Sequence, residues 1–131
     1  MMKMNLFIAE GENHVRDALH LLLEQEGFDI VGEADHVESL LAQVCTQPPS
    51  ILLLDWRLPG LRPHHLVKTL REHCPDVVIV AMSVRLEDRV SALAAGADLF
   101  MPKSLSPKKI LNMLHTLPTS KTPIKSNARN K

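Results

Sequence analysis

A short run of branched apolar residues, Ile51–Leu54, ends directly at Asp55 and is followed by a turn at Pro59-Gly60. Such a run predicts a central strand of a parallel sheet that is covered by helices on both faces. In open sheets of this kind, ligands bind at the carboxyl ends of the strands. Asp55 is therefore the first candidate for a functional residue.

The same unit recurs along the chain. Short apolar runs alternate with longer stretches in which apolar residues return every three or four positions, a pattern typical of repeated strand–helix units. Five units are predicted, so we expect an α/β protein with a five-stranded parallel sheet and five helices. The predicted strands are 6–9, 30–34, 51–55, 77–82 and 99–101. In chain order, the apolar residues that mark the five helices are Val15, Leu19, Leu22 and Leu23; Val37, Leu40, Leu41 and Val44; Leu66, Val67 and Leu70; Val90, Leu93 and Ala94; and Ile110, Leu111, Leu114 and Leu117.

Local signals refine this prediction. The second strand contains Gly32 and Glu33, so we expect it at an edge of the sheet, whereas the fourth is free of charge and should be fully buried. Ser106-Pro107 precedes the last helix, and serine is a good helix cap while proline suits the first turn.

The chain of 131 residues is long enough for one domain with a buried core, which we place at residues 1–117. All 15 acidic residues precede Pro118, together with 11 of the 15 basic ones, so the domain is acidic and the segment 118–131 is basic. Ile124 is the only bulky apolar residue of that segment, which we expect to be a disordered tail or a linker stub. An acidic domain argues against direct nucleic-acid binding, which needs basic residues clustered on structured elements.

The sequence also indicates a compartment. Two cysteines, Cys45 and Cys74, are too few for a disulfide framework and suit a reducing environment. The apolar stretch that follows the first residues is too short for a secretion signal or a membrane span. We therefore expect a cytoplasmic protein that does not enter the membrane.

Reactive side chains follow four of the predicted strands. Glu10 and Glu12 follow the first, Asp55 ends the third, Ser83 follows the fourth and Lys103 follows the fifth. Right-handed connections bring these strand ends to one edge of the sheet. Carboxylates, a hydroxyl and an ammonium group together suit phosphoryl transfer, with one carboxylate as the nucleophile and Mg²⁺ bound by acidic oxygens.

Four ordered motifs carry a family resemblance. They are Ile8-Ala9-Glu10, Leu53-Leu54-Asp55-Trp56-Arg57-Leu58-Pro59-Gly60, Ala81-Met82-Ser83, and Gly96-Ala97-Asp98-Leu99-Phe100-Met101-Pro102-Lys103. In this order and spacing, residues 4–117 resemble the receiver domain of two-component response regulators, the CheY-like domain. The resemblance implies a doubly wound, flavodoxin-like fold with strand order 2-1-3-4-5. It also implies that Asp55 is the phosphoacceptor, Ser83 the switch hydroxyl, Phe100 the switch aromatic and Lys103 the lysine that binds the phosphoryl group.

One position departs from the family pattern. The family usually has two acidic residues in tandem after the first strand, of which the second ligates the metal directly, whereas this chain has Glu10-Gly11. The remaining ligands implied by the resemblance are Glu10, Asp55 and the backbone carbonyl of Arg57, with Glu12 as a further candidate. Because Mg²⁺ demands near-octahedral oxygen ligands, we expect Mg²⁺ to bind weakly.

The leading hypothesis is a phosphoacceptor switch in a two-component phosphorelay. Asp55 takes a phosphoryl group from a histidine kinase or a histidine phosphotransfer protein, and partner binding then changes at the face of the fourth helix, fifth strand and fifth helix, which is also a candidate homodimer surface. Such a receiver is a signalling protein that at most catalyses its own phosphorylation and dephosphorylation. The alternative is a pseudo-receiver, a protein-interaction module whose Mg²⁺-dependent phosphorylation is impaired by Gly11.

Simpler interpretations stay open for single residues. Asp55 could cap the following turn, and Glu10 and Glu12 could be acidic residues favoured at a helix N-terminus. Phe100 could be a core residue, although we expect its side chain to be half-exposed. A flavodoxin-like FMN carrier is disfavoured because the loop after the first strand lacks hydroxyls, and an aspartate phosphatase because Arg57 stands where a second Asp is required.

Overall fold

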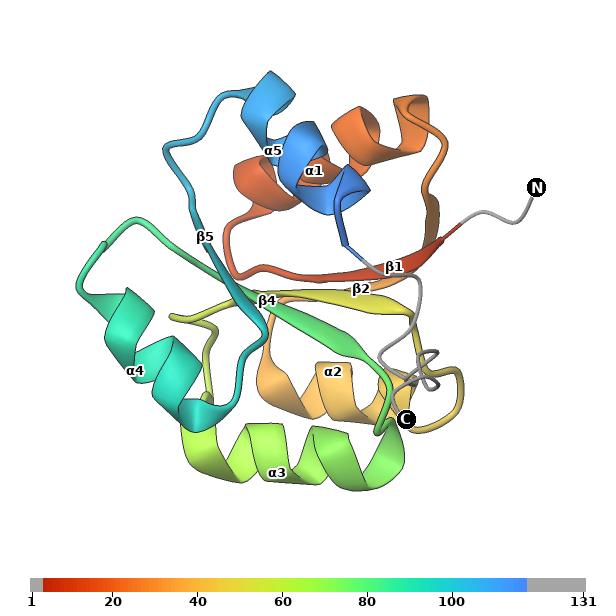
Figure 1. Ribbon diagram of the computed structural model, residues 1–131. Coiled ribbons are helices and arrows are strands. Elements are labelled where there is room, and N and C mark those ends of the chain that lie inside the picture. Colours follow the sequence, from red (N-terminus) through yellow and green to blue (C-terminus); the bar gives the residue numbers. More distant parts are fainter. Residues whose placement is uncertain (1–3, 118–131) are drawn as a thin grey trace, which may run out of the picture.

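Strands and helices alternate along the chain, as the sequence predicts. The computed structural model describes residues 4–117 and contains β1 (Asn5–Ala9), α1 (Asn13–Gln25), β2 (Asp29–Ala34), α2 (Val37–Val44), β3 (Ile51–Asp55), α3 (Pro63–His73), β4 (Val78–Ser83), α4 (Asp88–Ala95), β5 (Leu99–Pro102) and α5 (Pro107–His115) (Figure 1). The strands form one parallel sheet in the order β2-β1-β3-β4-β5, which confirms the predicted fold. The segment 118–131, predicted to be a tail, lies outside the described residues.

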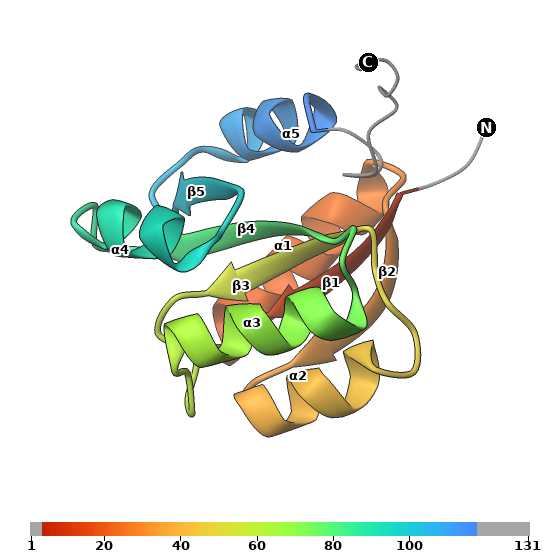
Figure 2. The same ribbon diagram turned by 60° about the horizontal axis from the view of Figure 1, so that its bottom comes forward.

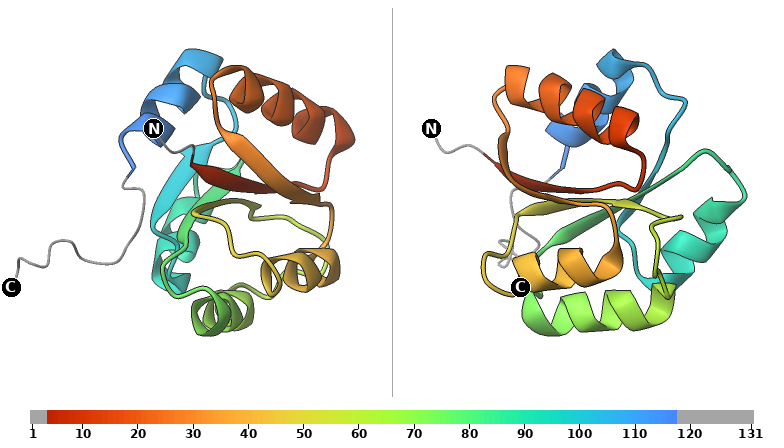
Figure 3. Two further views of the ribbon diagram at one scale, coloured as in Figure 1. Left: turned by 90° about the vertical axis from the view of Figure 1, so that its right-hand side faces the viewer. Right: turned by 180° about the vertical axis from the view of Figure 1, so that it is seen from behind.

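Two helical layers enclose the sheet. Figure 2 shows α2 and α3 side by side on one face, and Figure 3 shows α1 and α5 together on the other. Successive side chains of a strand point to opposite faces, so neighbouring residues enter different cores. Leu53 packs in a cluster with Leu23 of α1 and Leu114 of α5, whereas Leu54 packs in a cluster with Leu40 of α2.

The local predictions for the strands and for the last helix are confirmed. β2 lies at the edge of the sheet and is mostly half-buried, whereas every residue of β4 is buried. The Ser106 side chain caps α5, because its hydroxyl oxygen accepts a hydrogen bond from the backbone N–H of Lys109 at 3.3 Å.

The predicted inner face of α4 is wrong, although the helix itself is confirmed. Val90 and Leu93 are 77% and 40% exposed, and Ala94 is also exposed, whereas the buried apolar residues are Ala92 and Ala95. Apolar periodicity marks a helix, but it does not mark which apolar stripe faces the core. Here the small alanine side chains pack inward, and the larger side chains lie on the surface.

The carboxyl ends of β1, β3, β4 and β5 meet at one edge of the sheet. Backbone hydrogen bonds continue the pairing just beyond the strands, from the Trp56 N–H to the Met82 carbonyl at 2.7 Å and from the Lys103 N–H to the Ser83 carbonyl at 2.9 Å. The loops that follow these strands are therefore fixed where they leave the sheet. Within residues 4–117, no helix has the length and apolar character needed to span a membrane.

Candidate functional site

Asp55 stands at the centre of this edge of the sheet. Its residue surface is 3% exposed, and its carboxylate accepts hydrogen bonds from the backbone N–H of Gly11 at 3.2 Å and from the backbone N–H of Arg57 at 2.9 Å. The Lys103 Nζ lies 3.2 Å from Asp55 Oδ1. Two main-chain donors and one ammonium group thus fix the orientation of a nearly buried carboxylate.

Lys103 also pairs with Glu10. Its Nζ lies 2.9 Å from Glu10 Oε1 and 3.2 Å from Oε2, and Glu10 is fully buried. Burial alone would lower the pKa of Lys103, but its hydrogen bond to Glu10 and the charge of Asp55 outweigh burial and raise that pKa. Burial has the opposite effect on an acid, and it raises the pKa of Glu10 although the Lys103 hydrogen bond acts to lower it. The lysine therefore stays protonated between two carboxylates.

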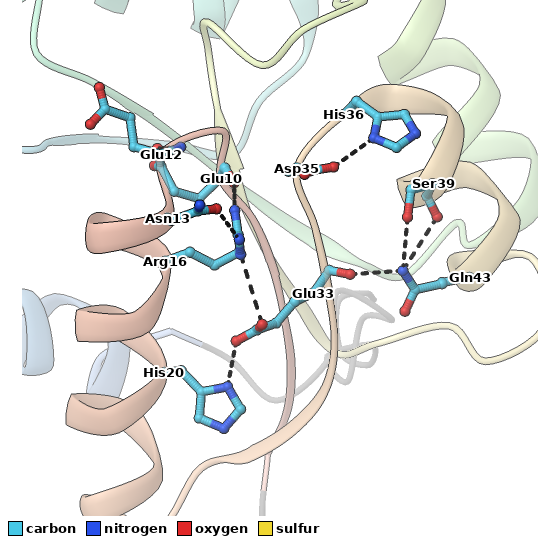
Figure 4. A network of polar contacts seen from close by, with 10 residues as sticks. All are labelled: Glu10, Glu12, Asn13, Arg16, His20, Glu33, Asp35, His36, Ser39 and Gln43. Atoms are coloured by element: carbon cyan, nitrogen blue, oxygen red, sulfur yellow. Dashed lines mark hydrogen bonds and ion pairs between the residues drawn. The ribbon is translucent and has the colours of Figure 1, made fainter.

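The side chain of Glu12 does not join this group. It is exposed, and Figure 4 shows it directed away from Glu10; only its backbone N–H contacts Glu10, by donating to Oε2 at 3.0 Å.

Ser83 ends β4 at this edge of the sheet, whereas Phe100 lies inside β5, and the two side chains have different surroundings. Ser83 is fully buried, and its hydroxyl donates to Asp88 Oδ2 at 2.7 Å. Phe100 pairs with Ala81 across β4 and β5 and is only 7% exposed, so the expected half-exposure is wrong. Its ring belongs to the cluster beneath α2, α3 and α4, because residue 100 of β5 points to that face.

Asp88 and the side chain of Arg57 were not predicted from the sequence to belong to the site. Asp88 is 8% exposed, and the guanidinium of Arg57 binds it through Nε and Nη2 at 3.1 and 3.0 Å. Burial would raise the pKa of Asp88, but the hydrogen bonds from Ser83 and Arg57 hold it below its ordinary value. The sequence signal that could have indicated Asp88 is its position at the start of a predicted helix, five residues after Ser83.

A second polar network supports the β1–α1 loop (Figure 4). Arg16 Nη1 donates to the Glu10 carbonyl at 2.8 Å, and Arg16 Nε lies 3.8 Å from Glu33 Oε1. His20 Nδ1 lies 2.5 Å from the other oxygen of Glu33, and this hydrogen bond raises the pKa of His20. The network ties the loop that carries Glu10 and Gly11 to the edge strand β2.

The oxygen atoms at the site suit Mg²⁺ in kind. Glu10, Asp55 and the backbone carbonyl of Arg57 are the candidate ligands, and Mg²⁺ commonly binds one or two carboxylates and completes its shell with water and phosphate oxygens. Within residues 4–117, however, no group of three or more His, Cys, Asp or Glu side chains is arranged to hold a metal. A Cβ atom at Gly11 would lie 3.5 Å from Asp55 Oδ2, so position 11 faces Asp55 without supplying a ligand.

This fold and this set of side chains define a signalling domain of the two-component type, and comparison with known proteins identifies the family. The model of the response regulator receiver domain matches residues 6–115, and the chain belongs to this family. Phosphate regulon transcriptional regulatory protein PhoB of Klebsiella pneumoniae is 34% identical over 114 residues, which cover 84% of this chain and 49% of PhoB. Transcriptional regulatory protein CreB of Escherichia coli (strain K12) is 29% identical over 119 residues, which cover 89% of this chain and 52% of CreB. The chain therefore spans about half the length of the curated relatives it matches.

Solved structures show the same fold. A two-component response regulator of the LuxR family from Aurantimonas sp. SI85-9A1 superposes with a TM-score of 0.78 at 20% identity, covering 87% of this chain and 84% of that chain. A CheY-like response regulator receiver domain protein from Methanospirillum hungatei JF-1 superposes with a TM-score of 0.76 at 22% identity, covering 87% and 92%. Receiver domains are signalling domains that generally use Mg²⁺ in their phosphorylation.

Proposed function

We propose that this receiver takes a phosphoryl group from a phosphohistidine onto Asp55 and thereby changes its affinity for a partner. The donor is a histidine kinase or a histidine phosphotransfer protein. The observation that carries the proposal is the position of the Asp55 carboxylate, nearly buried at a strand end and 3.2 Å from the Lys103 ammonium. In the reaction, a carboxylate oxygen bonds to phosphorus while the phosphorus–nitrogen bond to the imidazole breaks, and the imidazole leaves as the neutral ring once it is protonated.

The side chains around Asp55 have separate roles in this proposal. The backbone N–H groups of Gly11 and Arg57 orient the carboxylate. Lys103 provides positive charge for the transferring phosphoryl group, which suits a reaction that depends mainly on positioning and electrostatics. Ser83 provides a hydroxyl for a phosphoryl oxygen, and Phe100 is the neighbouring aromatic of the switch.

Glu10, Asp55 and the Arg57 carbonyl would hold Mg²⁺. When bound, the ion supplies positive charge that neutralises the phosphoryl oxygens. We propose that its affinity is weak, because Glu10 is already paired with Lys103 and Gly11 contributes no ligand.

The test is covalent labelling of the full chain. Incubation with phosphoramidate and Mg²⁺ should add one phosphoryl group that is labile in both acid and base, detected as a mass gain that hydroxylamine removes. Asp55→Asn should abolish this gain. Asp76→Asn is the matched control, because Asp76 is exposed and follows α3 at the opposite edge of the sheet. Undiminished labelling of Asp55→Asn would show that another residue is the acceptor.

Partner binding is proposed at the face formed by α4, β5 and α5. Val90 and Leu93 of α4 are exposed, and a homodimer through this face is the candidate output in the absence of another partner. Sedimentation of the labelled and unlabelled chain measures dimer formation directly.

We place the protein in the cytoplasm, where its phosphodonor would act, and propose no direct nucleic-acid binding by residues 1–117.

A pseudo-receiver is the second candidate function. It is favoured by Gly11, because the site offers two acidic side chains and one of them, Glu10, is already bound to Lys103. In this case the domain binds its partner without phosphorylation. Absence of labelling in the natural chain, together with labelling of a Gly11→Asp variant, would support the pseudo-receiver over the phosphoacceptor switch.

A further inference from the structure

The only proton of the Ser83 hydroxyl is already used in a hydrogen bond. It donates to Asp88 Oδ2 at 2.7 Å and accepts from the backbone N–H of Arg85 at 3.0 Å. A serine hydroxyl has one proton to donate. Ser83 therefore cannot donate to Asp88 and to a phosphoryl oxygen on Asp55 at the same time.

Asp88 is in turn held by a residue of the phosphoacceptor loop. The Arg57 guanidinium forms a two-point contact with it, from Nε to Oδ2 at 3.1 Å and from Nη2 to Oδ1 at 3.0 Å. The backbone N–H of the same arginine donates to Asp55 Oδ1 at 2.9 Å. Arg57 thus contacts both carboxylates, Asp55 through its main chain and Asp88 through its side chain.

The neighbouring residue makes a parallel contact with the same helix. Trp56 Nε1 donates to the Ser91 hydroxyl oxygen at 3.4 Å, and Ser91 lies one turn after Asp88 in α4. The two residues that directly follow Asp55 therefore both bind the first half of α4. These contacts connect the segment after Asp55 to α4.

We propose that Asp88, clamped by Arg57, is a latch that holds Ser83 in the unphosphorylated arrangement and opposes phosphorylation of Asp55. The proposal rests on the proposed phosphoacceptor function and deepens it. A phosphoryl group on Asp55 brings charged acceptor oxygens, which compete with Asp88 for the Ser83 proton and for the Arg57 guanidinium. Because the two hydrogen bonds of Ser83 exclude each other, the site has two discrete arrangements, and Asp88 is the positioning residue that favours one of them.

The latch makes a quantitative prediction for Asp88→Ala. At a fixed concentration of phosphoramidate and Mg²⁺, the ratio of phosphorylated to free Asp55 should rise about tenfold, which corresponds to about 1.4 kcal/mol. Glu87→Ala is the matched control, because it removes the same charge from the adjacent, exposed residue. In a Ser83→Ala background, Asp88→Ala should give a clearly smaller rise, since there is no hydroxyl left to release and only the Arg57 guanidinium is freed. A merely structural role of Asp88 would not depend on Ser83 in this way.

A second measurement is made without phosphorylation. In the natural chain the Arg85 amide proton should resonate at the position of a hydrogen-bonded amide, and Asp88→Ala should shift it because the Ser83 hydroxyl turns. If Asp88→Ala does not fold, Asp88→Asn keeps an oxygen acceptor without the charge and should raise the labelled ratio in the same direction by a smaller factor.

The outcomes separate the latch from the function on which it rests. Equal labelling of the natural chain and of Asp88→Ala would overturn the latch and leave the phosphoacceptor function standing. Labelling of Asp88→Ala alone would support both. If neither chain is labelled, the phosphoacceptor function fails and the latch fails with it as a regulator of that reaction.

Discussion

Replacement of Gly11 by Asp should create the carboxylate that the metal site lacks. A Cβ atom at position 11 would lie 3.5 Å from Asp55 Oδ2, and a carboxylate oxygen lies about 2.4 Å beyond Cβ. Two oxygens bound to one Mg²⁺ at right angles are about 3 Å apart, given metal–oxygen distances of about 2.1 Å. The new carboxylate can therefore share an ion with Asp55, once the Pro59 ring, 3.2 Å from the new Cβ, shifts by a few tenths of an ångström.

The size of the effect follows from the charges. Two unit charges about 4 Å apart interact by about 4 kcal/mol near a protein surface, so attraction to a divalent ion contributes about 8 kcal/mol and repulsion from Asp55 costs about 4. Glu10 adds little repulsion because Lys103 already neutralises it. Dehydration of the ion and of the new carboxylate consumes much of the remainder. We expect Mg²⁺ to bind about tenfold to a hundredfold more tightly, or about 1.4 to 2.8 kcal/mol.

Trp56 provides the assay. It is the only tryptophan, follows Asp55 directly and is 5% exposed, so its fluorescence should respond to an ion at the site. Titration with Mg²⁺ should give a weak response in the natural chain and a clear, saturable one in Gly11→Asp. Gly11→Asn is the matched control, because both side chains meet the same close contact, 3.2 Å from Cβ to Pro59 Cδ, and only one carries a charge. Equally tight binding in the natural chain and in Gly11→Asp would refute the argument, since an existing group would then already supply the ligand.

Two further perturbations test the electrostatics. Lys103→Met should destabilise the fold by about 3 kcal/mol, because it leaves the fully buried Glu10 carboxylate without its partner, and adding Glu10→Gln should restore more than half of that loss in denaturant titrations. No recovery in the double variant would contradict this assignment. The pKa of His20 is raised in the folded state, first by its hydrogen bond to Glu33, so its contribution to stability is complete below its unfolded pKa of about 6.5 and is lost as the pH rises through the folded pKa. The His20 side chain is more than a third exposed, and its Glu33 partner also pairs with Arg16, so we expect a contribution of at most about 1 kcal/mol. It is measured as the stability difference between the natural chain and His20→Gln at about pH 5.5 and about pH 8.5, and an equal difference at both would count against it.

The sequence alone determined the fold. Apolar runs such as Ile51–Leu54 can be buried only between two layers, and helices with one apolar stripe provide those layers, so the alternation of the two patterns defines a parallel α/β sheet. The position of Asp55 at the end of such a run was equally local information. The grouping of Asp55, Glu10 and Lys103 followed from topology, because parallel strands with right-handed connections end at the same edge.

Tertiary structure decided how those groups are paired. Lys103 could have bound either carboxylate, and only the folded sheet, in which β1 flanks β3 and β5 lies beyond β4, places its Nζ within reach of both Glu10 and Asp55. The same holds for α4, where periodicity identified a helix but the choice between Val90 and Ala92 as the buried residue depended on how closely the helix approaches the sheet.

The hydrogen bond from Ser83 to Asp88 and the contact of Arg57 with Asp88 were also beyond the sequence. Arg57 and Asp88 come from different connections of the chain, whereas Ser83 and Asp88 flank the same one, and the direction of a short side chain depends on backbone dihedral angles that no local pattern specifies. Sequence therefore determines which chemical groups reach the edge of the sheet, because strand order and periodicity are encoded locally. Only the folded structure decides which donor meets which acceptor there, because each hydrogen bond depends on distances of a few tenths of an ångström between separate elements.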